Sequence, residues 1–375
     1  MRAGRTIAVF ALLLCGFSVL TFGEVMERSD GGGVGGNAPR PRGVQGDSSL
    51  SIDADASIDM QEYLFGHIAD AYEWHITNVN GNHVSIPLPV ILIDNGVHVF
   101  SSRHLAHGAE YDGYRIAAAG EASEGKIVRT SDGKRPFDIS ITKNVCGLLI
   151  DSVLLVVLIL LCARWYRRHD VLKEAPTGIA GLFEPLIVMI EQDVIKDAVG
   201  PEYQKFSPYL LTAFFFILIN NLMGIVPFFP GGANITGNIA VTMAMAVFTF
   251  LAVNLFGNRH YWKEIFWPDV PIFLKAIPIM PVIEIIGMFT KPFSLMIRLF
   301  ANMLAGHIML LSTIAVIFLT VKLGPAINGS LSVISVLFGI FLDVLELLVA
   351  FIQAYVFTML SSVFIGLAHP QHETH

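Results

Sequence analysis

A run of 53 residues, from residue 206 to residue 258, contains no Asp, Glu, Lys or Arg. A pair of helices in a soluble protein needs a charged face toward solvent, whereas two membrane-spanning helices need none. Over all 375 residues, 54% are hydrophobic and 15% are charged, against about 25% charged residues in soluble domains. These features exclude a disordered chain and a purely soluble one. The net charge of −7 offers no basic surface for phosphate groups, so we predict no nucleic-acid partner.

Apolar stretches long enough to cross a bilayer, which takes roughly 20 residues, recur along the second half of the chain. The last two are longer than a span and must tilt. Residues 178–199 carry too many charges to span, and they predict an amphipathic helix at the cytoplasmic face. The sequence therefore predicts an all-α polytopic membrane protein with five membrane helices plus this amphipathic helix. The five predicted spans are residues 145–163, 209–229, 235–256, 281–321 and 330–368.

The first 143 residues differ in composition from the predicted membrane domain, residues 144–375. Residues 1–23 combine basic residues, an apolar stretch and a small residue at a cleavage position, the pattern of a secretory signal peptide; an uncleaved anchor is the alternative. Residues 24–50 are rich in Gly and Pro and predict a flexible linker. Residues 51–143 have a soluble composition and predict a small N-terminal α+β extracytoplasmic domain.

Within that domain, an aromatic stretch over residues 63–75 predicts a helix. Alternating apolar residues over 84–93 and 97–100 predict strands, separated by Asn-Gly turns. The region contains several histidines, but no pair has the spacing of a metalloprotease motif. The 3 cysteines of the chain fit neither a zinc site nor a disulfide framework. We predict no metal and no cofactor, and without a G-x-x-x-x-G-K-[ST] loop we predict no ATP hydrolysis by this chain.

Basic residues indicate how the chain is oriented in the membrane. Arg164, Arg167 and Arg168 follow the first predicted span directly, and positive charge marks the cytoplasmic side. We therefore predict a multi-pass protein of the cell inner membrane, with a periplasmic N-terminal domain and a cytoplasmic C-terminus. Asp151 lies about two turns from the outer end of the first span, and we expect it at the membrane interface.

Charged side chains inside predicted spans are costly and point to function. Arg298 is permanently protonated, and Asn302 lies one turn further on the same helical face. Glu284 lies about 21 Å before Arg298 along the helix, and His307 about 13 Å after it. Taken singly, each of these residues has a structural explanation: the arginine can snorkel to the interface, the histidine can be a core residue, and the carboxylates can belong to a structural network. Taken together, they favour a water-filled ion path. The last helix adds three polar residues that share one face: Asp343, Glu346 and Gln353.

Several segments resemble subunit a of the rotary F-type ATP synthases. The run Arg-Leu-Phe-Ala-Asn-Met-Leu-Ala-Gly-His from Arg298 to His307 is similar to the hallmark segment of that family. The run Gln-Ala-Tyr-Val-Phe from Gln353 resembles its final helix. The run Asn-Leu-Met-Gly-Ile-Val-Pro from Asn221 resembles one of its middle spans. The resemblance covers about residues 145–368.

This resemblance implies a non-catalytic stator that offers two half-channels to a rotating ring of c subunits, for protons or, in some members, for Na⁺. Arg298 then faces the ring carboxylate, with Asn302 and Gln353 beside it. The implied partners are the c-ring, the b subunits of the peripheral stalk and the lipid bilayer. The other ion-path positions are His307 and Glu346 in the external half-channel, Asp343 as an extension of the inlet, and Glu284 at the cytoplasmic exit.

Three positions depart from the pattern of some family members. Some bacterial members have an acidic residue at the position of His307 and a histidine at that of Glu346, so the pair is swapped in this chain. Some have an acidic residue at the position of Gly224, and the glycine puts a role for the second span in doubt. The residues alone leave two other functions open. The first is a secondary transporter with a midplane charged site, which would be expected to contain internal repeats. The second is a membrane-anchored periplasmic binding module, which would give Arg298 no function.

Overall fold

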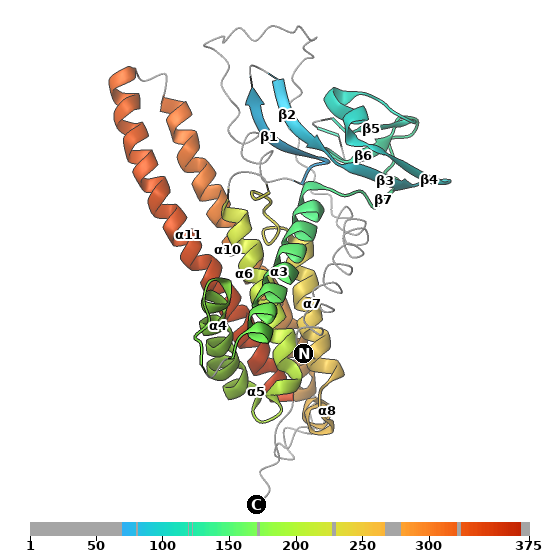
Figure 1. Ribbon diagram of the computed structural model, residues 1–375. Coiled ribbons are helices and arrows are strands. Elements are labelled where there is room, and N and C mark those ends of the chain that lie inside the picture. Colours follow the sequence, from blue (N-terminus) through green and yellow to red (C-terminus); the bar gives the residue numbers. More distant parts are fainter. Residues whose placement is uncertain are drawn as a thin grey trace, which may run out of the picture.

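The computed structural model of the chain describes residues 70–79, 82–118, 120–121, 123–170, 173–226, 230–266, 279–320 and 324–368. The predicted signal peptide and linker lie outside these residues. In the described part, a bundle of long helices carries a region of short strands at its upper end (Figure 1). We call this the strand end of the bundle and the opposite end the far end.

Helices form within all five stretches predicted as membrane spans. Among the described helices, four are long and apolar enough to cross a membrane, and α7, with 17 residues, is shorter. This mostly helical architecture is that of a polytopic membrane protein. The five helices are α3 (Lys143–Arg168), α6 (Tyr203–Ile225), α7 (Ile239–Leu255), α10 (Ile279–Leu319) and α11 (Pro325–Ala368).

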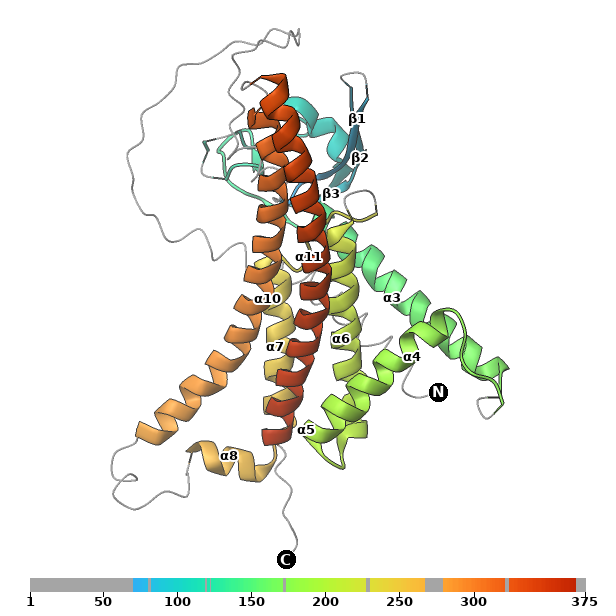
Figure 2. The same cartoon turned by 90° about the vertical axis from the view of Figure 1, so that its left-hand side faces the viewer.

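The stretch predicted as an amphipathic helix, residues 178–199, is helical. Helix α4 (Ile179–Met189) continues into the π-helical segment η3 (Ile190–Lys196), and α5 (Asp197–Val199) completes it. A further short helix, α8 (Arg259–Phe266), follows α7 at the far end of the bundle (Figure 2).

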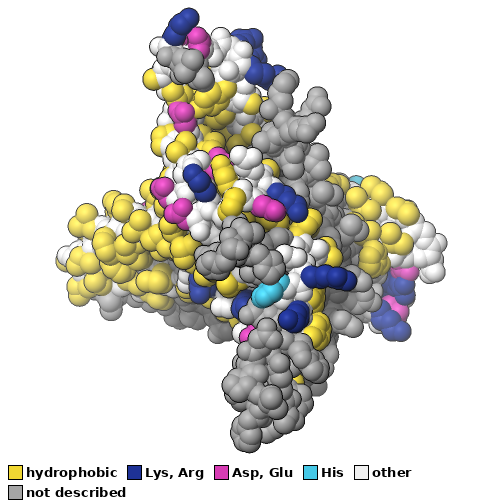
Figure 3. Space-filling model, turned by 90° about the horizontal axis from the view of Figure 1, so that it is seen from below, with side chains coloured by type: hydrophobic (Ala, Val, Ile, Leu, Met, Phe, Trp, Pro, Cys, Tyr) yellow, Lys and Arg dark blue, Asp and Glu magenta, His cyan; other side chains and the backbone are white. Residues whose placement is uncertain are grey.

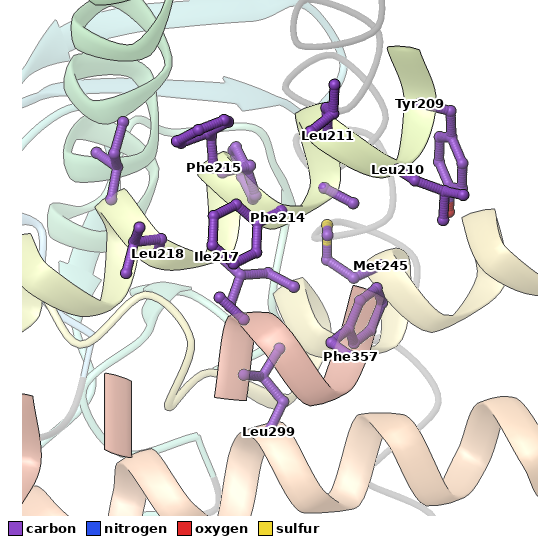
Figure 4. Packing of buried hydrophobic residues seen from close by; sticks show 14 of the residues in the cluster. Tyr209, Leu210, Leu211, Phe214, Phe215, Ile217, Leu218, Met245, Leu299 and Phe357 are labelled. Atoms are coloured by element: carbon purple, nitrogen blue, oxygen red, sulfur yellow. The ribbon is translucent and has the colours of Figure 1, made fainter. Parts of the chain in front are cut away.

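Helix α6 covers the first part of the charge-free run in the sequence. In its membrane-spanning window, 78% of the residues are buried inside the structure, and a helix that is apolar on all sides is stable only when it is covered on all sides. It packs against α3, η3 and α11. Figure 4 shows Phe214 and Ile217 of α6 in one cluster with Phe357 of α11 and Leu299 of α10.

Helices α10 and α11 form a long hairpin that projects beyond the other helices at the strand end (Figures 1 and 2). They have 41 and 44 residues, or about 60 Å each at 1.5 Å per residue. This is twice the roughly 30 Å of hydrocarbon in a bilayer, so both must tilt. Only 11% and 22% of the residues in their spanning windows are buried, so most of the hairpin surface is free for lipid or another chain.

The strand region consists of small antiparallel sheets. One side of the β3-centred sheet packs on a small core of Tyr72, Val90, Leu92, Leu105, Tyr114 and Ile127. The strands are β1 (Glu73–Val79) paired with β2 (Asn82–Pro87), β3 (Pro89–Ile93) between β4 (Val97–Ser101) and β7 (Phe137–Asp138), and β5 (Tyr114–Ile116) paired with β6 (Ile127–Arg129); a 3₁₀ turn, η2 (Ser102–Gly108), follows β4.

Two local predictions for this region are wrong. The predicted helix over residues 63–75 ends inside strand β1, where Glu73 is exposed and Trp74 is buried, the alternation of a strand; residues 63–69 lie outside the described part. The predicted strand over 84–93 is interrupted at Leu88. A proline precedes and follows Leu88, and proline has no N–H to donate to a ladder. The Leu88 N–H donates instead to the Ser102 hydroxyl at 3.0 Å.

Phe216 of α6 is fully buried, so truncating it leaves a cavity that the surrounding helices fill only in part. We expect Phe216→Ala to lower the free energy of unfolding of the detergent-solubilised chain by about 3 kcal/mol, measured by denaturant titration with circular dichroism. Phe293→Ala is the matched control, because Phe293 on α10 is exposed. Equal losses in the two variants would contradict the central position of α6.

Candidate functional site

Arg298 lies on the exposed face of α10. The same stretch carries Leu295, Leu299 and Met303, which are buried; their spacing of four residues makes one helical stripe beside Arg298. Arg298 and Asn302 lie between these positions and are exposed. Within the described part of the chain, no carboxylate forms an ion pair with Arg298. Its positive charge is therefore open to a group from outside the chain.

A groove separates α10 from α11 next to this exposed face. It has a volume of about 310 Å³ and is lined by Asn302 and Gly306 of α10 and by Glu346 and Gln353 of α11, together with apolar residues. Both Glu346 and Gln353 are buried. The structure thus brings three of the predicted site residues, Asn302, Glu346 and Gln353, to one groove.

Glu346, which lines this groove, is in contact with His307 of α10. His307 Nδ1 and Glu346 Oε1 are 3.0 Å apart, which is ion-pair distance, although the angles are not those of a hydrogen bond. A Cβ atom at Gly306 would lie 3.0 Å from the same carboxylate oxygen. The glycine therefore leaves the space that the Glu346 carboxylate occupies.

Gly224 connects α6 to the same pair. A Cβ atom at Gly224 would lie 3.7 Å from His307 Cε1 and 3.9 Å from its Nε2. A carboxylate side chain at this position would therefore reach the histidine. The second span borders the site, and the glycine leaves the imidazole of His307 beside a single described carboxylate, that of Glu346.

Asn221 of α6 forms side-chain hydrogen bonds to two other parts of the chain near this site. Its side-chain N–H donates to the Ala350 carbonyl of α11 at 3.2 Å, and its carbonyl oxygen accepts from the Thr236 hydroxyl at 2.7 Å. Asn221 has no exposed surface. Buried polar groups of this kind are costly when unpaired, so the two hydrogen bonds favour one arrangement of α6 and α11.

A second polar region lies toward the far end of α10. Lys291 and Tyr261 line a small cavity of about 30 Å³ together with Asn254, and the Tyr261 hydroxyl donates to Asn254 Oδ1 at 3.2 Å. Burial raises the pKa of Tyr261, and the negative charge of Glu284 raises it further. Glu284 lies on the other side of Arg298 from His307 along α10.

Two predicted acidic residues lie apart from the groove. Asp343 is exposed on α11, three residues from the buried Glu346, and does not line the groove. Asp151 is buried on α3, and both its carboxylate oxygens have no hydrogen-bond partner in the described residues. Packing of the bundle covers Asp151, and its expected position at the membrane interface stays a prediction. In the described residues no cluster of three His, Cys, Asp or Glu side chains could hold a metal ion.

Sequence reasoning missed a polar contact that joins three helices. The Tyr209 hydroxyl of α6 lies 3.0 Å from Thr249 Oγ1 of α7, which lies 3.4 Å from Ser361 Oγ of α11. Single hydroxyl groups in apolar helices leave no periodic signal, so only their packing reveals this contact. For Gly224 and Gly306 a signal was available, because both stand within the runs that resemble the ATP synthase family.

Comparisons with known proteins agree with that resemblance. The family model described as ATP synthase A chain matches residues 149–366, and one described as a domain of unknown function (DUF8433) matches residues 63–145. An ATP synthase subunit a 2 from Chlorobaculum tepidum is 44% identical over 244 residues, which cover 64% of this chain and 66% of that relative.

Other relatives are similar over a comparable length of the chain. The ATP synthase subunit a from Pelodictyon phaeoclathratiforme is 45% identical over 246 residues, 64% of this chain and 68% of the relative. That from Myxococcus xanthus is 41% identical over 239 residues, 62% of this chain and 74% of the relative. The match with the Chlorobaculum tepidum relative spans just under two thirds of that protein, at 66%.

The two hydrogen bonds of Asn221 predict a stability effect. We expect Asn221→Ala to lower the free energy of unfolding by about 2 kcal/mol, because it leaves the buried partners unpaired. Asn302→Ala is the control, since Asn302 is exposed and should lose less than about 0.5 kcal/mol. Denaturant titration of the purified chain measures both, and a neutral Asn221→Ala would contradict the bracing role.

Proposed function

The chain belongs to the family of ATP synthase A chains, and we propose on this basis that it is the ion-translocating stator subunit of the Fo membrane sector. It is a non-catalytic subunit, and ATP chemistry belongs to its partners. It lies in the inner membrane as a multi-pass protein, with residues 1–23 as signal peptide, residues 51–143 in the periplasm and the C-terminus in the cytoplasm. The rotating c-ring and the b subunits of the peripheral stalk are its partners.

The observation that carries the proposal is the exposed Arg298 on a hairpin that is largely unburied. A charge that faces away from its own chain inside the membrane is costly unless it meets an opposite charge. A carboxylate on each c subunit supplies that charge. The apolar residues exposed around Arg298 on α10 and α11, among them Ile297, Leu345 and Leu348, form the surface along which the ring helices pass.

The ion path has one half on each side of Arg298. Ions enter from the periplasm past Asp343 to the His307 and Glu346 pair and reach the ring through the groove lined by Asn302 and Gln353. The buried contact between His307 and Glu346 supports this half-channel. Ions leave through the region of Glu284, which is supported by the small cavity beside Tyr261.

Arg298 separates the two halves. A proton that arrives by way of Glu346 neutralises a ring carboxylate, which can then move into the apolar membrane. On the exit side the carboxylate loses its proton toward Glu284, and its negative charge is attracted to Arg298, which favours the ionised form. The guanidinium keeps its proton at any working pH, so it cannot pass a proton directly from one half-channel to the other.

Removal of this charge tests the proposal. We expect Arg298→Ala to abolish ATP-driven proton pumping in inverted membrane vesicles and to raise the passive proton leak, because the barrier between the half-channels is gone. Arg167→Ala is the control, since Arg167 is an exposed arginine in the last turn of α3. Assembly of the complex is checked by its subunit content. Unchanged pumping in an assembled Arg298→Ala complex would favour a transporter instead.

The pair His307 and Glu346 gives a second test. We expect His307→Glu and Glu346→His alone to lose most pumping, because each places two like groups at a buried contact of 3.0 Å. The double variant restores the acid and base pair in the order found in some bacterial members of the family, and we expect it to regain pumping. Additive losses in the double variant would show that the two residues act independently.

A further inference from the structure

Strand β3 is apolar on both of its faces. Val90 and Leu92 point into the small core of the strand region and are fully buried. Ile91 and Ile93, which alternate with them, lie on the opposite face, because successive strand residues point to opposite sides of a sheet. A strand that is apolar on both faces is typical of a sheet covered on both sides.

The outer face of this sheet is apolar across all three strands. Ile93 pairs with Val97 of β4 and with Phe137 of β7, and Ile91 pairs with Val99; directly paired residues lie on the same face. Exposure is 69% for Val97, 66% for Val99 and 48% for Phe137. We call this surface the apolar sheet face, formed by Ile91, Ile93, Val97, Val99, Phe137 and Ile139.

The apolar sheet face points toward the far end of the bundle. In Figure 1, β3, β4 and β7 lie beside the upper end of α3 and extend away from the bundle, with β5 and β6 above them. Viewed from below, a hydrophobic surface appears on the side where these strands project (Figure 3). The face is thus turned in the direction in which α3 descends through the membrane.

Short connections keep this face close to the membrane surface. Only four residues separate Asp138, the end of β7, from Lys143, the first residue of α3, and the Thr142 side chain caps that helix by accepting from the Val145 N–H. On α3, Leu149 and Val153 are exposed apolar residues of the membrane span. Leu149 lies about 9 Å below Lys143 at 1.5 Å per residue.

We propose that the apolar sheet face rests on the bilayer and inserts its side chains at the boundary between headgroups and acyl chains. Amphipathic elements bind there with their apolar side buried about 5–10 Å, and the exposed Leu149 lies at a comparable distance, about 9 Å, along α3 from the first residue of that helix. The lipid surface, continuous with that of α3, covers the second face of β3. The strand region is then held by lipid as well as by its connection to α3, independently of how the helical domain conducts ions.

Spin labels on the full-length chain in phosphatidylcholine and phosphatidylglycerol nanodiscs test this proposal. Cys15, Cys146 and Cys162 are replaced by serine, and a nitroxide is attached to Val97→Cys or Val99→Cys. Oxygen, which concentrates in lipid, and a water-soluble nickel chelate are compared as relaxing agents. The reference positions are Val153→Cys on the exposed side of α3 and Glu124→Cys, exposed between β5 and β6.

We expect labels at residues 97 and 99 to respond to oxygen as the label at residue 153 does, and the label at residue 124 to respond to the nickel chelate. Dominant nickel accessibility at 97 and 99 would overturn the proposal, because the face would then lie in water. Protection from both agents would also overturn it, since another part of this chain would then cover the face.

Discussion

The enclosure of α6 by other helices is the constraint on which the remaining structure depends. This helix has no charged residue after Lys205, and it is stable in that composition because protein covers it on nearly every side. Its buried Asn221 side chain donates a hydrogen bond to the backbone of α11, which favours one position of that helix. With α11 in place, Glu346 meets His307 of α10, and Gly224 of α6 closes against the same histidine.

The same packing explains why α10 has two unlike faces. Leu299 and its neighbours on one stripe are buried in the bundle, whereas Arg298 and Asn302 face outward. A helix in lipid alone would not keep an arginine there, because insertion of the charge costs roughly 3 kcal/mol. The hairpin therefore has one face that packs on its own chain and one exposed face that carries a charge. In the proposed function, the ring carboxylate meets that charge.

The strand region also has one face buried by its own chain and one face left exposed. Its small core covers only one face of the sheet around β3, and on the other face Val97 and Val99 of β4 are exposed. In water such a face is unfavourable in proportion to its apolar area, while at a bilayer it is not. If the bilayer covers that face, lipid and protein together bury what a region this small cannot bury by itself.

The sequence by itself determined the polytopic helical class, the helical stretches and the alignment of Arg298 with Asn302, because hydropathy and helical periodicity act along one segment at a time. The predicted strand over 84–93 failed at Leu88 for a reason also written in the sequence, because the prolines on either side of Leu88 have no N–H to donate to a ladder. Only the tertiary structure decided that Gly224 borders His307 and that Asp151 is buried. The physical reason is that hydropathy measures the transfer of each residue to an apolar medium, whereas these contacts join helices far apart in the chain and depend on how those helices cross.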